Sequence, residues 1–210
     1  MELNIAEAQR YLGVTVPDEA LTADITALAA TLQARITPRF VWAVLPPQSN
    51  DELSIKHYEF SRALLADCTH IAVLAASLGA EFDLWVRREQ ARNMGRAAML
   101  DALGSAYVEA ACDAAEAEIR ARFPGKHLTD RFSPGYGDLP LALQPALLSV
   151  TGAHRIGVTL TDSLLMNPQK SVSAIVGISD TPQPARIRGC AHCHLREHCA
   201  YRKAGTTCHV

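Results

Sequence analysis

Four of the six cysteines of the chain lie within nineteen residues near its C-terminal end, where their thiolates could bind a metal. A Cys-x-x-Cys pair places two thiolates on one metal at little loop cost, and two further cysteines complete four-coordination. The spacing predicts a metal site, either an iron–sulfur cluster or zinc, with these four ligands: Cys190, Cys193, Cys199 and Cys208. Free thiols without a metal are the alternative.

The segment "RFSPGYG", residues 131–137, is the second candidate for chemistry. Its glycines permit backbone conformations and close approaches that side chains would block, and Pro134 stiffens the entry. Arg131 could hold a carboxylate or phosphate through two parallel hydrogen bonds, and Tyr136 offers a flat apolar face with one polar tip. The segment is therefore a candidate ligand loop. The alternative is a rigid connector in which Arg131 pairs with a surface acid.

Composition sets limits on the class of protein. The 210 residues are 49% hydrophobic and 20% charged, as in soluble globular proteins, and the longest apolar run has ten residues. We therefore expect a cytoplasmic protein. The net charge of −2 gives no general reason to bind nucleic acid or a membrane surface. Only residues 186–210, which carry +4 against −6 for the remainder, support an alternative zinc-knuckle protein that contacts nucleic acid.

The elements that must position these residues follow from hydrophobic periodicity and cap signals. We expect helices over 4–13, 17–36 and 59–68, two more over 81–122 divided near Gly95, and one that carries Pro145 in its first turn and ends near Gly152. Strands are expected over 39–46, 69–79, 154–161 and 171–179. This order predicts an α+β fold, with helices packed on a twisted antiparallel or mixed sheet. The domain spans 1–180, and 181–210 form a linker and a small metal-binding tail.

The long alanine-rich segment also predicts its own orientation. Leu100, Leu103 and Tyr107, continued by alanines at the same spacing, form a stripe of one helix that would face the core. The acidic residues between them are expected to face outward; they are Asp101, Glu109, Asp113 and Glu116.

Several motifs follow one another in a distinctive order over nearly fifty residues. They are Arg131, Pro134-Gly135-Tyr136, Leu160-Thr161-Asp162-Ser163, Met166, Pro168 and Ser171-Val172-Ser173. In type, order and spacing this series resembles the C-terminal reactivation domain of cobalamin (vitamin B12)-dependent methionine synthase. The earlier part of the chain is similar to stand-alone, shortened versions of that domain, so the resemblance covers residues 1–180.

The resemblance implies a methyltransferase-type function, the reductive reactivation of a cobalamin-dependent methionine synthase. S-adenosylmethionine would be the methyl donor that converts cob(II)alamin to methylcobalamin on a separate cobalamin-binding partner. Arg131 would hold the donor's carboxylate, and backbone groups of Pro134, Gly135 and Tyr136 would receive its polar edges. Thr161, Asp162 and Ser163 would also contact the donor; a polar strand end with an Asx or Ser turn is their alternative. No side-chain general base is implied.

The same resemblance bears on the metal and on the partners. The reaction needs a low-potential electron from a donor such as flavodoxin or ferredoxin, and a cluster beside the site would supply it directly. This favours an iron–sulfur cluster over zinc, although nearby histidines could also serve zinc; they are His192, His194, His198 and His209. The alternative function is a non-catalytic iron–sulfur electron-transfer or corrinoid-handling accessory protein.

Overall fold

The computed structural model describes residues 1–14, 18–45, 55, 58–184, 197, 200–203 and 205. The four cysteines predicted as metal ligands, Cys190, Cys193, Cys199 and Cys208, lie outside these residues. Within the described ranges, no cluster of three or more histidine, cysteine or acidic side chains could hold a metal ion. A search of the same ranges finds no helix with the length and hydropathy needed to cross a membrane.

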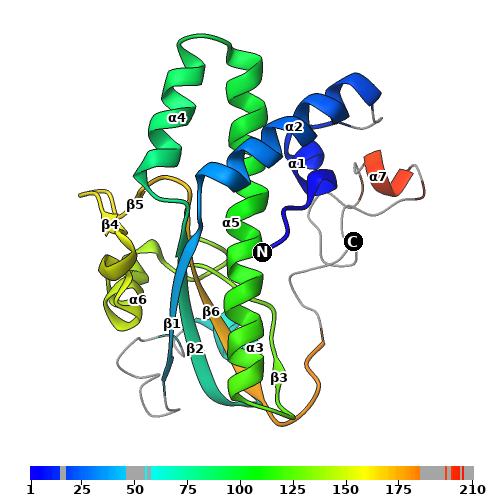
Figure 1. The fold of residues 1–210 in the computed structure, drawn as a ribbon. Coiled ribbons are helices and arrows are strands. Elements are labelled where there is room, and N and C mark those ends of the chain that lie inside the picture. The colour runs from blue at the N-terminus through cyan, green and yellow to red at the C-terminus, as the bar shows by residue number, and fades with distance from the viewer. Residues whose placement is uncertain are drawn as a thin grey trace.

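A four-stranded antiparallel sheet forms the centre of the fold, in the order β1-β2-β6-β3 (Figure 1). The strands are β1 (Arg39–Leu45), β2 (Cys68–Ser77), β6 (Ser171–Ser179) and the short β3 (His127–Leu128). Helices pack on this sheet, and the predicted α+β class is confirmed, with the sheet antiparallel rather than mixed. Three of the four predicted strands are those found in the sheet as β1, β2 and β6.

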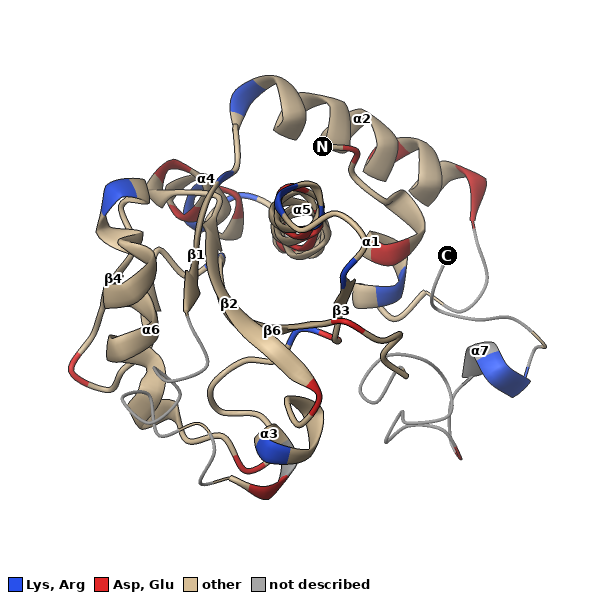
Figure 2. Ribbon diagram, turned by 90° about the horizontal axis from the view of Figure 1, so that it is seen from below, with Lys and Arg blue, Asp and Glu red and all other residues tan. Residues whose placement is uncertain are grey.

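Strand β2 is apolar along most of its length because both of its faces are buried. Ala72 and Leu74 pack on the helical side, whereas Ile71 and Val73 pack against the segment around α6. Figure 2 looks along α5 and shows the sheet curving around this helix, with α2 beyond it and α3 and α6 on the opposite face. The sheet is therefore a middle layer between two sets of helices.

The first six helices correspond to the six predicted ones, although the third ends at Leu64 because β2 begins at Cys68; the seventh lies in the predicted tail, where no helix was expected. The helices are α1 (Ile5–Tyr11), α2 (Glu19–Arg35), α3 (Glu59–Leu64), α4 (Ala80–Gln90), α5 (Met94–Arg122), α6 (Gln144–Thr151) and α7 (Ala200–Lys203). Asn4 and Asp18 cap α1 and α2 by accepting hydrogen bonds from backbone N–H groups. Helix α6 carries Pro145 in its first turn and ends at Gly152, whose left-handed φ of 65° closes it as predicted.

Helices α4 and α5 are separate, as predicted, but the break lies at residues 91–93 and not at Gly95. Asn93 begins α5 by accepting a 3.0 Å hydrogen bond from the Arg96 N–H, so a capping side chain sets the boundary. Gly95 lies within the first turn of the helix. The 29 residues of α5 exceed the length we expected for one helix, and packing against the sheet and against α1, α2 and α4 supports them.

The prediction of a strand over residues 154–161 is mostly wrong. Its first part is a 3₁₀ turn, η4 (Ala153–Ile156), and Gly157 then adopts a left-handed φ of 80° that an extended strand excludes. Only β4 (Thr159–Leu160) is extended, and it pairs with β5 (Met166–Asn167) in a separate two-stranded hairpin. The apolar residues of this segment, such as Val158, bury against α6 and β2 instead of joining the sheet.

Candidate functional site

The three segments that carry the motif series line a single cavity of about 570 Å³. The walls come from the loop after β3 with the start of α6 that follows it, the β4–β5 hairpin, the start of β6 and one residue of α5. The lining residues include Arg131, Phe132, Ser133, Pro134, Tyr136, Gly137, Leu164, Leu165, Met166, Ser171, Val172, Ser173 and Glu109. Segments about forty residues apart in the sequence therefore meet at one site. A volume of this size suits a small organic ligand.

The loop of residues 131–141 is fixed to the sheet at one end and folded on itself at the other. Phe132 forms a two-way backbone bridge with Ile175 of β6, with N···O distances of 3.1 and 2.8 Å. The Gly135 N–H then donates to the Leu139 carbonyl at 2.8 Å, and the Leu139 side chain is buried. Gly135 has a φ of 90°, in a region that other residues adopt only at a cost. These contacts explain why the constrained residues gather here.

Two large apolar side chains are exposed at the rim of the cavity. Tyr136 is 74% exposed and Leu165 is 58% exposed, and both line the cavity from different elements. Because both side chains border the same cavity, they are available to contact a ligand that enters it. Their position makes the mouth of the cavity apolar, while Glu109 and Arg131 make its inner part charged.

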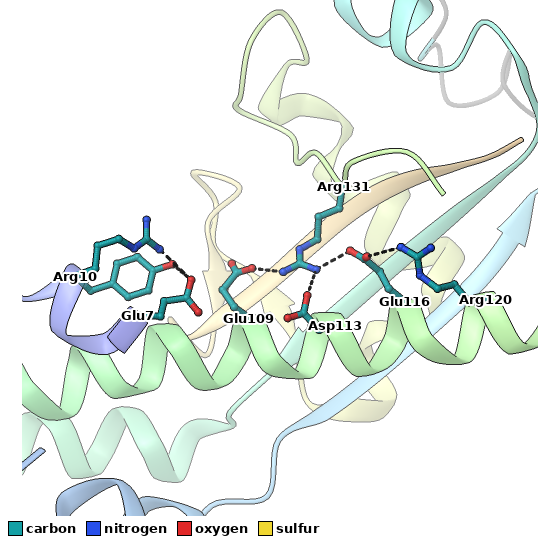
Figure 3. Close-up of polar contacts among 8 residues, drawn as sticks. Glu7, Arg10, Glu109, Asp113, Glu116, Arg120 and Arg131 are labelled. Carbon is teal, nitrogen blue, oxygen red and sulfur yellow. Dashed lines mark hydrogen bonds and ion pairs between the residues drawn. The ribbon is translucent and has the colours of Figure 1, made fainter. Parts of the chain in front are cut away.

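Arg131 reaches from the loop to helix α5, where it meets three carboxylates (Figure 3). Its guanidinium lies 2.6 Å from the carboxylates of Asp113 and Glu116, and it also pairs with Glu109. The side chain is 8% exposed. Glu116 lies 3.8 Å from Arg120 as well, so the row continues along the helix. The loop and α5 are therefore joined by a charged cluster, which we name the Arg131 cluster.

The charges of this cluster do not cancel. One guanidinium faces three carboxylates, which leaves an excess of negative charge even when Arg120 is counted. Burial by itself lowers the pKa of Arg131, but the nearby carboxylates of Glu109 and Glu116 and the hydrogen bond to Asp113 raise it by more. Arg131 is accordingly a cation at every accessible pH. The wall of the cavity itself carries one charge of each sign, Glu109 and Arg131, and the excess carboxylates lie behind Arg131 on α5, where they favour a ligand that carries positive charge.

The prediction that the acids of α5 face outward holds for Asp101 and Asp113, which are exposed, and is wrong for Glu116. Glu116 is buried, and Glu109 and Asp113 point toward Arg131. The predicted stripe holds at its start, where Leu100, Leu103 and Tyr107 are buried, but further along the helix Ala111 and Ala115 are buried in place of the predicted alanines. Small alanines on every side of this part of α5 gave the sequence no signal for that change of face.

The predicted contact residues of the β4–β5 hairpin lie beside the cavity rather than in its wall. Thr161, Asp162 and Ser163 are exposed and are not among the lining residues. The Thr161 and Ser163 hydroxyls are 3.0 Å apart, and the Thr161 hydroxyl accepts from the Leu165 N–H at 3.1 Å. These hydroxyls are engaged within the hairpin turn, and a contact of Thr161, Asp162 and Ser163 with the donor stays a prediction. The turn directs the following residues, Leu164 and Leu165, to the cavity.

Sequence reasoning missed several lining residues because their types gave no chemical signal. Gln144 is the first residue of α6, and its side-chain oxygen accepts a 3.1 Å hydrogen bond from the Ser173 hydroxyl of β6. Both side chains are buried and line the cavity. Glu109 had only its place in an acidic row as a signal. Of the predicted loop residues, Arg131, Pro134 and Tyr136 line the cavity, and Gly135 forms the turn between them.

Comparison with known proteins supports the same class of fold. The sequence matches no protein-family model and no curated protein. Among solved structures, the chain is similar to a crystal structure of the MetH reactivation domain bound to AdoHcy, with a TM-score of 0.53 and 16% sequence identity. The match covers 96% of this chain and 74% of that domain. The chain thus has the fold of a methionine synthase reactivation domain, in agreement with the resemblance seen in its motifs.

Proposed function

We propose that this protein binds S-adenosylmethionine in the cavity and serves in the reductive reactivation of a cobalamin-dependent methionine synthase on a separate protein. One observation carries the proposal: the three motif segments that resemble the reactivation domain converge on one cavity of suitable volume. The AdoHcy bound to the structurally similar domain supports a ligand of the same class. The reaction would convert cob(II)alamin to methylcobalamin, a methyltransferase-type activity.

The charges of the cavity suit this donor. S-adenosylmethionine carries a carboxylate, an ammonium and a sulfonium, and is a cation overall, which matches the negative excess of the Arg131 cluster. We assign the carboxylate to the remaining donors of Arg131 and the ammonium to Glu109, which lines the cavity beside it. The N–H groups of Gly135 and Tyr136 already donate within the loop. The carbonyl oxygens of Pro134 and Gly135 would therefore receive the donor's polar edges.

The protein's own contribution would be binding and orientation. The corrinoid on the partner supplies the cobalt that accepts the methyl group, one electron comes from a donor such as flavodoxin or ferredoxin, and S-adenosylhomocysteine is released. Tyr136 and Leu165 at the rim would shield the sulfonium from water and hold it toward the partner. No side chain has to move a proton in this scheme, and none is assigned as a base.

For the cysteine-rich tail, we propose an iron–sulfur cluster held by Cys190, Cys193, Cys199 and Cys208 as the electron relay, with zinc as the alternative. Anaerobically purified protein should contain iron and acid-labile sulfide in matching amounts and should absorb broadly in the visible range. Substitution of Cys193 by Ala should remove both. One equivalent of zinc with a colourless protein would exclude the relay.

Binding of the donor is tested by calorimetric titration with S-adenosylmethionine. Arg131→Ala should abolish detectable binding, because the carboxylate loses its partner and Glu109 is left without a counterion. Leu165→Ala should weaken binding several-fold. Leu84→Ala is the matched control, since Leu84 is similarly exposed but does not line the cavity. Circular dichroism of each variant separates a lost contact from a lost fold.

Wild-type protein that fails to bind S-adenosylmethionine would sink the catalytic proposal. The second candidate function, a non-catalytic electron-transfer or corrinoid-handling accessory, would then apply. It has its own support, because three carboxylates already engage Arg131 and could restrict it to a structural role. The two functions separate in one assay: with a reductant and a partner in the cob(II)alamin form, only the first yields methylcobalamin in proportion to added S-adenosylmethionine.

A further inference from the structure

The hairpin between α4 and α5 carries a strongly basic tip that the proposed donor site does not use. Residues 87–96 contain four arginines and one glutamate, a charge of +3, whereas the rest of the chain sums to −5. Figure 1 shows this tip at the end of the molecule opposite β3. Arg87, Arg88 and Arg92 are exposed, and among the described residues none of them has an ion-pair partner.

The one acid within the tip is already occupied. Glu89 accepts a 3.1 Å hydrogen bond from the indole N–H of Trp85 and lies 3.5 Å from the Arg96 guanidinium across the hairpin. Trp85 itself is buried beneath Arg35 of α2, whose guanidinium carbon lies 4.7 Å from the ring centre. These contacts join the base of the tip to α2 and α5. Because Glu89 is engaged with Trp85 and Arg96, it does not pair with the three exposed arginines.

Exposed apolar side chains lie among these arginines. Leu84 is 49% exposed and precedes Arg87 and Arg88 by three and four residues, which places all three on one face of α4. Met94, at the start of α5, is 66% exposed. Arginine and methionine are enriched at protein-binding surfaces, so exposed arginines beside these two apolar side chains are consistent with a surface of that kind.

From this composition we propose that the basic tip, together with Leu84 on the adjoining turn of α4, docks a protein partner. The partner's surface would present acidic side chains to Arg87, Arg88 and Arg92, and an apolar centre to Leu84 and Met94. Charge complementarity selects the sign of the partner and would speed its encounter. Leu84 and Met94 favour protein over nucleic acid, because a phosphate backbone offers them no apolar contact. The tip lies about 22 Å from Glu109 along α5, from the rise of a helix, so it is distinct from the cavity. The proposal does not depend on donor binding.

Fluorescence titrations with three probes test this assignment. They are a short peptide of glutamates around a central pair of leucines, an all-glutamate peptide of equal charge, and a DNA duplex. We expect the leucine-containing peptide to bind about tenfold more tightly than the all-glutamate peptide, as burial of one leucine allows. The triple variant R87E/R88E/R92E should lose about tenfold or more of that affinity, and L84A/M94A should remove the difference between the two peptides.

The matched control is R39E/R62E/R122E, which makes the same charge change at three exposed arginines elsewhere and should bind the leucine-containing peptide like the wild type. Equal binding of all three probes, or equal loss in the control, would overturn the proposal, because either result means attraction to any polyanion. Titration of R87E/R88E/R92E with S-adenosylmethionine distinguishes failure of this proposal from failure of the proposed function. The affinity of the variant for S-adenosylmethionine should match that of the wild type whether or not the peptide still binds.

Discussion

Arg131 joins two parts of the structure and is also the residue we assign to the ligand. Its side chain is almost fully buried, and its three carboxylate partners all belong to one helix. The Arg131 cluster therefore connects the cavity wall to α5. Removal of Arg131 would leave three carboxylates facing one another without a counterion from the loop.

Arg131→Ala should lower the free energy of unfolding by about 3 kcal/mol, the usual effect of removing one partner from a buried ion pair. Urea denaturation followed by circular dichroism measures it. Arg62→Ala, at an exposed arginine of α3, is the control and should change stability by less than about 0.5 kcal/mol. Equal effects of the two substitutions would show that the cluster does not stabilise the fold.

Cys112 gives a prediction for alkaline pH. Burial raises the pKa of its thiol from the ordinary 9.0 to about 12, with smaller contributions from the surrounding charges. Below pH 9 the thiol is neutral in both the folded and the unfolded chain, so its contribution is fully present. Between pH 9 and 12 only the unfolded thiol ionises, and stability falls with rising pH.

In the Cys112→Ala variant this loss should be missing. The variant starts from a lower stability because alanine leaves a small cavity, but its unfolding free energy should fall less steeply above pH 9, by up to about 1.4 kcal/mol per pH unit. Chemical denaturation at a series of alkaline pH values gives both slopes. Parallel slopes would mean that Cys112 ionises in the folded protein.

At the scale of elements, the contact of α4 with α5 depends on one glycine. A Cβ at Gly104 would lie 2.6 Å from Cε1 of the buried Phe82 ring and closer still to Cζ. Non-bonded carbon atoms do not approach this closely, so α4 or the Phe82 ring would have to move. The close approach lets Phe82 fill the space between the two helices, and it requires a residue without a side chain at this position.

Gly104→Ala should therefore destabilise the protein by about 1–3 kcal/mol, although alanine is the better helix former. Gly95→Ala is the matched control in the same helix, because its nearest neighbour would be Asn93 Oδ1 at 3.4 Å. That substitution should be neutral or stabilising by up to about 1 kcal/mol. Thermal and urea unfolding of both variants give the comparison, and stabilisation by Gly104→Ala would contradict the packing described.

The elements that the sequence predicts well are those fixed by local signals. Asn4, Asp18 and Gly152 mark helix ends by their own chemistry, and β2 is recognisable from its apolar run. The β4–β5 hairpin is not recognisable in this way. Its two-residue strands pair only with each other, and the apolar residues beside them pack against α6 and β2. The site divides in the same way. Arg131 and Tyr136 stand in a motif, whereas Glu109 and Gln144 become site residues only through packing distant in sequence.

For the whole molecule, the described core ends with β6. Ser179, the last residue of that strand, is buried, and its hydroxyl accepts hydrogen bonds from the Thr181 N–H and the Gln183 side chain. A chain that stops after Pro184 should therefore keep the melting temperature of the full protein within a few degrees and keep its affinity for S-adenosylmethionine. It should lose all bound iron or zinc. Differential scanning calorimetry, titration and metal analysis test the three statements, and a truncated chain that fails to fold would refute the division into 1–180 and 181–210.

Helix α5 runs unbroken from the basic tip to the Arg131 cluster, so the length of the helix fixes the separation between them. A partner that docks on the tip is thereby held at a set separation from the cavity mouth, and no hinge within the helix can shorten it. Any protein that uses both surfaces at once must span that separation itself. The helix therefore selects partners by size as well as by charge: a small carrier could occupy one end at a time, and only a larger one could bridge both.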